Sequence, residues 1–263
     1  MKKITISTLF VMLGLITAFG ITAHATTITV TKDTYTYQYI EGEDTCAITA
    51  YTGTDADVVI PSEIDGKMVT IIGAKAFQGK TMQTLVIPDS VKEIGSNAIQ
   101  NCKNLESVTI GSGVETIHYA AFYGCKNLTS INLVSVKELG DYAFYNCTSL
   151  TDVTLSEGLI CIGARAFYNC SNLTKITLPN SVTTLGDYAF YFCSKLSDVT
   201  LSNQLEGIGD YAFEYCSALT QLDIPASVKS IGQYAFMGCN AITSITIPDS
   251  VTSMVAKVEN SKE

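Results

Sequence analysis

An internal repeat of 22 or 23 residues constrains the fold of this chain more than any other feature. The repeat is recognised by a hexapeptide such as residues 162–167, which has Ile or Leu first, usually Gly second and Ala-Phe at its end. The last residue of the hexapeptide occurs eight times, as Phe77, Ile99, Phe122, Phe144, Phe167, Phe190, Phe213 and Phe236. Eight copies of one short unit predict a repeat protein rather than a domain with a single irregular core.

Each unit continues in a fixed order of residue types. A cysteine follows the hexapeptide by three residues in seven units, as Cys102, Cys125, Cys147, Cys170, Cys193, Cys216 and Cys239. Leu or Ile comes three residues later, and an alternating run such as Val108-Thr109-Ile110 predicts a strand with one buried face. A unit this small cannot bury its own apolar side. We therefore expect a solenoid with one parallel β-sheet and short turn or helical segments on the outer side.

The repeated pattern I-G-x-x-A-F-x-x-C-x-x-L-x-x-V-x-I-P-x-S-V resembles the BspA-like leucine-rich repeats of bacterial surface antigens. The resemblance covers about residues 58–254, with Ile99 in place of Phe and Lys80 in place of Cys as departures. It implies a leucine-rich repeat solenoid. It also implies a surface or secreted protein that mediates adhesion and binds host proteins.

The sequence divides into four segments. Residues 1–25 have a positive start, an uncharged apolar run and an Ala-His-Ala cleavage motif, which predicts a bacterial signal peptide and a secreted or surface location. Residues 26–70 are expected to form a small β-rich N-terminal cap, because residues 26–54 break the period and Tyr35, Tyr37 and Tyr39 alternate with polar residues; Asp65-Gly66 predicts a hairpin turn. Residues 71–254 hold eight repeats, and residues 255–263 form a polar tail.

The end of the solenoid raises two alternatives. A strand is expected near residues 245–247, and no atypical polar coil follows it. An exposed parallel edge invites pairing with another chain, so we expect either shielding by the tail or a homodimer through this C-terminal edge.

Glycine and cysteine are the most regular small residues of the repeat. Glycine follows the Ile or Leu in seven of eight units, and His118 takes that place in the other, so we expect a backbone with positive φ there. The ladder cysteines are expected to be buried free thiols, because side chains in a ladder point in parallel and disulfides need a twisted geometry. Cys161 lies off the ladder and is expected to be more exposed.

Catalytic and cofactor motifs are missing from the sequence. After removal of the signal peptide His118 is the only histidine, and there is no C-x-x-C, P-loop, G-x-S-x-G or G-x-G-x-x-G. We therefore expect neither an enzyme nor a metal or other cofactor. Asp187 and Asp210 share one repeat position, where solvated repulsion is favoured over a bound cation. The formal charge of −9 argues against nucleic acid partners, and no second segment predicts membrane insertion.

The outward face of the predicted sheet is the first candidate binding surface. Its central row is polar and rich in hydroxyl groups, and beside it lie three residues of alternating charge. The candidate residues are Thr109, Asn132, Thr154, Thr177, Thr200, Asp223 and Thr246 in the row, with Asp152, Lys175 and Asp198 beside it. Repeat solenoids bind on extended faces of this kind, although Thr also simply suits exposed strand positions.

A stripe of tyrosines on the opposite side is the second candidate. Its members precede Ala-Phe, as Tyr142, Tyr188, Tyr211 and Tyr234, and a companion row, Tyr123, Tyr145, Tyr168 and Tyr191, follows the Phe. These rings either bind ligand or cover the outer turns. The leading hypothesis is a binding or adhesion protein that recognises a host or extracellular protein. A carbohydrate-binding module and a self-assembling structural surface protein are the alternatives.

Overall fold

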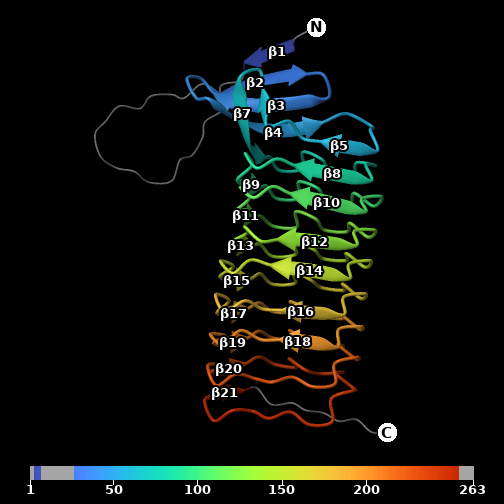
Figure 1. Cartoon of the computed structure of the whole chain (residues 1–263), viewed down its shortest axis with the longest axis vertical. Helices are drawn as coiled ribbons and strands as arrows, with labels where there is room; N and C mark the ends of the chain where they lie inside the picture. The colour runs from blue at the N-terminus through green and yellow to red at the C-terminus, as the bar shows by residue number, and fades with distance from the viewer. Residues whose placement is uncertain (1–2, 7–26, 255–263) are drawn as a thin grey trace, which may run out of the picture.

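The protein is a long stack of β-coils in a computed structural model that describes residues 3–6 and 27–254. Successive coils lie one below another from the N-terminal to the C-terminal end (Figure 1). No helix occurs within these described ranges, so the helical segments expected on the outer side are replaced by turns. No span of the described chain has the length and apolar character of a membrane-crossing helix.

Two columns of strands run along the stack, where the sequence predicted one parallel sheet. The first column is a continuous sheet whose solenoid part consists mainly of two-residue strands. Its parallel strands are β4 (Thr45–Tyr51), β7 (Lys67–Ile72), β9 (Glu93–Ile94), β11 (Thr116–Ile117), β13 (Glu138–Leu139), β15 (Cys161–Ile162), β17 (Thr184–Leu185), β19 (Gly207–Ile208), β20 (Ser230–Ile231) and β21 (Ser253–Met254). Each two-residue strand from β9 to β21 ends with an Ile, Leu or Met. From β9 to β20, this residue directly precedes the repeat glycine or His118.

The second column holds the longer strands that the alternating pattern predicted. Five of them form one parallel sheet, and two more continue below it in a separate pair (Figure 1). They are β5 (Asp57–Val59), β8 (Thr84–Ile87), β10 (Ser107–Ile110), β12 (Ser130–Leu133) and β14 (Asp152–Leu155), then β16 (Lys175–Thr177) and β18 (Asp198–Thr200). The strand expected near residues 245–247 is not formed, and the last coil instead ends in β21 beside β20.

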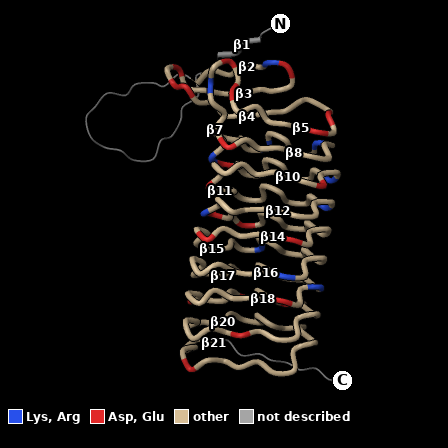
Figure 2. Tube along the Cα trace, viewed as in Figure 1, with Lys and Arg blue, Asp and Glu red and all other residues tan. Residues whose placement is uncertain are grey.

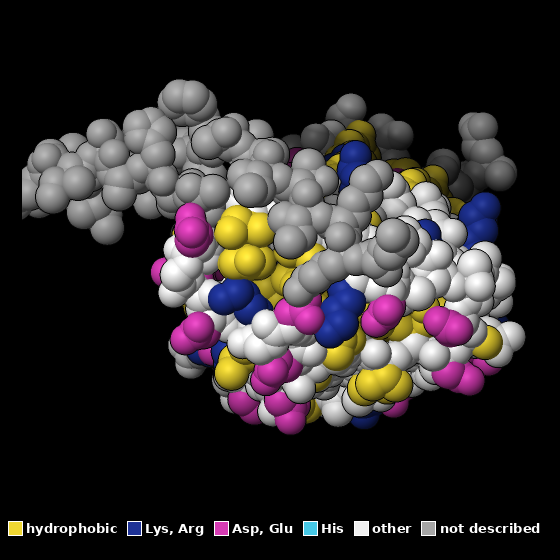
Figure 3. Space-filling view, turned by 90° about the horizontal axis from the view of Figure 1, so that it is seen from above, with side chains coloured by type: hydrophobic (Ala, Val, Ile, Leu, Met, Phe, Trp, Pro, Cys, Tyr) yellow, Lys and Arg dark blue, Asp and Glu magenta, His cyan; other side chains and the backbone are white. Residues whose placement is uncertain are grey.

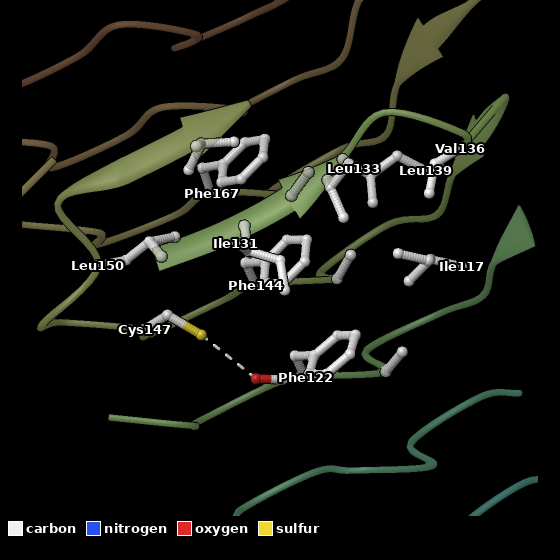
Figure 4. Close-up of a cluster of buried hydrophobic side chains, with 14 of the residues drawn as sticks. Ile117, Phe122, Ile131, Leu133, Val136, Leu139, Phe144, Cys147, Leu150 and Phe167 are labelled. Atoms are coloured by element: carbon white, nitrogen blue, oxygen red, sulfur yellow. Dashed lines mark hydrogen bonds between the residues drawn. The ribbon is translucent and has the colours of Figure 1, made fainter. Parts of the chain in front are cut away.

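The core between the two columns consists of ladders of identical side chains. The phenylalanine rings from Phe122 to Phe236 stack with centroids 5.1 to 5.9 Å apart in successive coils. Figure 4 shows three of these rings beside Leu150 and Cys147, and all of these side chains are fully buried. Most coils thus supply one ring, one thiol and one leucine to a continuous core, as the repeat predicted, with Ile99 and Lys80 as the departures at the ring and thiol positions.

The N-terminal cap is an antiparallel β-meander. Strands β2 (Thr27–Lys32), β3 (Tyr35–Ile40) and β4 pair in order, and β4 joins the solenoid by pairing with β7. Asp65 and Gly66, at φ values of 52° and 76°, form the predicted hairpin turn between β6 (Glu63–Ile64) and β7. The Tyr37 hydroxyl donates to Asp65 at 2.7 Å and ties the meander to this turn. Figure 3 looks down on this end, where hydrophobic and acidic side chains share the visible surface.

The predicted signal peptide and polar tail fall mainly outside the described residues. Within residues 1–25 the structure describes only β1 (Lys3–Ile6), which pairs antiparallel with β2. The tail, predicted at residues 255–263, is not described. Both assignments remain predictions from the sequence.

The prediction of positive φ at the repeat glycine is wrong. Neither Gly186 nor His118 has positive φ; a Cβ on Gly186 would instead lie 2.6 Å from the backbone nitrogen of Ala164 in the preceding coil. In the seven units that carry glycine, adjacent coils therefore approach too closely for a side chain. Positive φ occurs at two other positions of each coil, represented by Tyr188 at 57° and Asn169 at 54°.

Candidate binding surfaces

The exposed face of the second strand column brings the first set of predicted residues together. All ten are exposed: Thr109, Asn132, Thr154, Thr177, Thr200, Asp223, Thr246, Asp152, Lys175 and Asp198. Parallel pairing places Asn132 beside Thr154 and Thr177 beside Thr200. Neighbouring strands in a sheet are roughly 4.8 Å apart, so the row is an evenly spaced polar surface. Asp223 and Thr246 continue it outside the assigned strands.

Charge on this face is only partly neutralised. Lys175 Nζ lies 3.1 Å from Asp198 Oδ2, and both side chains are more than half exposed, so the pair adds little stability. Asp152 has no ion-pair partner among the described residues, and the predicted alternation therefore yields one pair rather than two. Figure 2 shows acidic and basic residues interspersed along both edges of the solenoid, without one dominant basic patch. The face can thus accept polar or basic groups of a ligand.

The tyrosine stripe lies on the segments that connect the two strand columns. Its residues Tyr142, Tyr188, Tyr211 and Tyr234 all have φ between 54° and 59°, a left-handed conformation that L-residues rarely adopt. The Tyr188 and Tyr211 rings stack at 4.5 Å, and Tyr211 stacks on Tyr234 at 5.3 Å. Each ring in the stack covers the face of its neighbour, so edges and hydroxyls are the parts that remain for a ligand.

Sequence reasoning missed Arg165, which occupies the stripe position between Tyr142 and Tyr188. Its guanidinium carbon lies 5.3 Å from the Tyr142 ring centroid and 4.3 Å from the Tyr188 centroid. Both distances are within the range of a cation–π interaction. The stripe therefore continues through this coil as a cation held between two aromatic faces. The signal in the sequence was a basic residue that interrupts four tyrosines at one repeat position, between Tyr142 and Tyr188.

The companion row of tyrosines is packed more tightly. Tyr123, Tyr145, Tyr168 and Tyr191 stack at 4.5 to 4.7 Å with interplanar angles of 13° or less. Burial raises the pKa of Tyr145, Tyr168 and Tyr191 above its ordinary value, because the phenolate would lose hydration. Each ring of this row therefore packs against its equivalents in the neighbouring coils. The row ends where Glu214 takes the tyrosine position.

The ladder cysteines serve the packing of the coils. Each is buried, and its Sγ donates to the carbonyl oxygen at the phenylalanine position of the preceding coil at 3.0 to 3.3 Å. Figure 4 shows this bond from Cys147 to Phe122. Burial raises the pKa of Cys147 and of Cys193 to about 12, which disfavours the reactive thiolate. Cys161 is more exposed, as predicted, but burial together with Glu138 and Asp141 also raises its pKa.

The repeated aspartates bind backbone rather than a cation. Asp187 Oδ1 accepts a hydrogen bond from the backbone nitrogen of Asp210 at 2.8 Å, and Asp210 Oδ1 accepts one from Gln233 at 2.6 Å. Asp141 does the same for Ala164 at 2.7 Å. Each carboxylate therefore links its coil to the next one by a hydrogen bond. This role differs from both expectations from the sequence, solvated repulsion and a bound cation. No cluster of three or more His, Cys, Asp or Glu side chains suited to a metal occurs in the described residues.

The stacked coils and their long exposed faces define a leucine-rich repeat solenoid, a class that generally acts as a non-enzymatic binding scaffold. Residues 70–174 and 161–258 match the BspA type leucine rich repeat region, in six copies. The chain belongs to this family.

Solved structures of bacterial leucine-rich repeat proteins are similar to the chain. The leucine rich repeat protein of T. pallidum is 32% identical with a TM-score of 0.67, over 71% of this chain and 88% of that one. Proteins from Bacteroides ovatus and Eubacterium ventriosum are 27% and 30% identical, with TM-scores of 0.64 and 0.60 over 85% and 74% of this chain. This chain covers 66% and 61% of those two proteins. No curated protein sequence matches the chain.

Proposed function

We propose that this protein is a secreted or surface-exposed bacterial protein that binds a host or other extracellular protein through the exposed face of its second strand column. The observation that carries the proposal is the ten-residue polar face, in which every predicted side chain is exposed, eight of them on strands and Asp223 and Thr246 in line with the row beyond them. A long, flat and rigid surface of this kind suits the broad contact of a protein ligand better than the enclosure of a small molecule.

Two further features support an extracellular binding role rather than catalysis. The sequence of residues 1–25 has the three parts of a signal peptide, which directs a chain out of the cytoplasm. The thiols of the ladder are buried, hydrogen-bonded donors, and the repeated carboxylates hold backbone groups of the next coil. The reactive side chains of the repeat are thus used in coil packing, and the polar strand face is left for recognition.

The test is capture of extracellular matrix and plasma proteins by the purified protein and by a triple variant, Thr154→Lys, Thr177→Lys and Thr200→Lys. Three long cationic side chains in one row prevent close contact with the face. We expect the variant to lose at least about tenfold in affinity, since each buried contact contributes on the order of 1 kcal/mol or more. Circular dichroism checks that the variant is folded.

A matched control places the same charges on the first strand column. Thr184, Ser230 and Ser253 are exposed residues of β17, β20 and β21, and their change to Lys adds three positive charges away from the face. The control is expected to bind as the wild type does. Equal binding by the wild type and the strand-face variant, both folded, would refute the proposed face.

A further inference from the structure

Two neighbouring coils depart from the repeat at the position before the cysteine. This backbone position has positive φ in all eight coils and carries Gly or Asn in six of them: Gly79, Asn101, Gly124, Asn146, Asn169 and Gly238. Phe192 and Tyr215 occupy it in the other two, at φ values of 58° and 60°. A bulky side chain is strained in this conformation, and both are exposed, by 44% and 37%. Core packing therefore does not explain them.

The rings of Phe192, Tyr215 and Tyr191 form a cluster with a different geometry from the tyrosine rows. Tyr215 lies 5.8 Å from Tyr191 at an interplanar angle of 90°, and 5.6 Å from Phe192 at 63°. Rings at these angles form a corner rather than a closed stack, so they leave aromatic surface uncovered. Gly238 of the next coil makes room for the corner, because a Cβ there would lie 2.5 Å from Tyr215 Cδ1.

Glu214, next to Tyr215, is a buried carboxylate beside this corner. It is only 4% exposed, and no described residue forms a hydrogen bond or ion pair with its side chain. The backbone nitrogen of Phe192 donates to the Glu214 carbonyl oxygen at 2.8 Å, so the two residues lie side by side in adjacent coils. Burial, and after it the Glu214 charge, raises the pKa of Tyr191. The Glu214 oxygens reach the surface but are poorly hydrated, and burial raises the pKa of this carboxyl group; a cation supplied from outside would offset the lost hydration.

Charge in this part of the chain favours a cation. Residues 187–254 contain seven acidic residues and two lysines, and Lys229 is paired with Glu206 at 3.3 Å. A cation–π interaction already occurs two coils earlier, where the Arg165 guanidinium lies between the Tyr142 and Tyr188 rings. Aromatic faces and a carboxylate together form the type of site that binds a guanidinium or ammonium group.

We propose that Tyr191, Phe192, Tyr215 and Glu214 form a site that binds a lysine or arginine side chain of a protein partner. The carboxylate pairs with the cation, and the rings cover its apolar stem. The inference rests on the proposed function, because the cation belongs to a protein ligand, but it assigns a contact on the connecting segments rather than on the strand face.

The test uses single-residue probes, N-acetyl-arginine methylamide and N-acetyl-lysine methylamide, with neutral N-acetyl-norleucine methylamide as control. Backbone amide shifts of the purified, isotope-labelled protein are followed by NMR. We expect saturable shifts at residues 191, 192, 214 and 215 with either cationic probe and none with the neutral one. Glu214→Gln should weaken binding about tenfold or more, since a charge-assisted pair is lost.

Two variants control for folding and for charge. Tyr215→Asn restores a residue found at this position in other coils, so it should fold well and lose the shifts. Asp249→Asn removes one exposed acidic charge elsewhere and should bind as the wild type does. Absence of shifts with both cationic probes, equal shifts with the neutral probe, or unchanged binding in both site variants would overturn the inference. These results need no protein partner, so they leave the strand-face proposal to its own test.

Discussion

Replacing Gly186 by alanine is expected to lower the free energy of unfolding by about 2–3 kcal/mol. The added Cβ would lie 2.6 Å from Ala164 N and 2.7 Å from Gly163 C, which are backbone atoms of the preceding coil. The first distance is about 0.9 Å short of an ordinary contact of ~3.5 Å. Rigid backbone cannot give way as a flexible side chain can, so the two coils must separate. That separation stretches the bond from Gly186 N to the Ile162 carbonyl, now 3.0 Å long.

The measurement is thermal and urea unfolding of Gly186→Ala and Gly186→Asn beside Gly79→Ala and Gly79→Asn. Gly79 has a φ of 69° and open space around its Cβ position, so Asn should be tolerated better than Ala there. At Gly186 the limit is space, and Asn should be at least as harmful as Ala. A melting temperature about 2–4 °C lower is expected for each kcal/mol lost. A Gly186→Asn variant clearly more stable than Gly186→Ala would refute the steric explanation.

Three further predictions concern single side chains. Thiol reagents at about pH 8 should modify Cys161 before Cys193, because burial raises the pKa of Cys193 to about 12; peptide mass spectrometry of the labelled protein checks the order. Glu214→Gln should stabilise the protein by up to about 1 kcal/mol near neutral pH. Burial raises the pKa of Glu214, so its ionised form destabilises the folded protein. This destabilisation is absent below the ordinary pKa of 4.5 and complete above the folded-state pKa. Urea unfolding at several pH values should therefore show that the stability gained by Glu214→Gln vanishes in acid. His118→Gly should keep or raise the melting temperature, because the seven other units carry glycine at this position and only an exposed 3.1 Å contact with Glu93 is lost; a clear drop would contradict this.

The ladders of the core could be predicted from the sequence because one physical requirement recurs in every coil. A residue such as Phe167 contacts its equivalents Phe144 and Phe190, so each substitution must suit two identical neighbours. The period of the sequence is therefore the period of the structure. The two-residue strands were missed for a related reason. A pair such as Thr184 and Leu185 is too short to show alternation, and its strand character comes from the coils above and below.

The role of the repeat glycine could not be assigned from glycine alone, because a positive φ and a close backbone approach both select the same residue. The two causes differ in which other residues they accept. The position before the cysteine accepts Asn at 101, 146 and 169, which is typical of positive φ, and the structure confirms that conformation. The position after the Ile or Leu holds no Asn in any unit. Comparison of the two positions would have separated the causes before the structure was known.

The candidate cation site was missed because repeat analysis weighs what recurs, whereas a binding site on a solenoid requires coils that differ. Glu214 breaks the companion tyrosine row, and Phe192 and Tyr215 replace the Gly or Asn that the backbone favours. Each departure has a physical cost, in a poorly hydrated charge or in backbone strain, that the consensus residue would avoid. Three such departures lie in two adjacent coils, and they supply a carboxylate and two aromatic rings, the groups that bind a cation. A costly departure from the repeat is therefore a stronger indication of a ligand than the regular Thr row, which exposed strand propensity alone would produce.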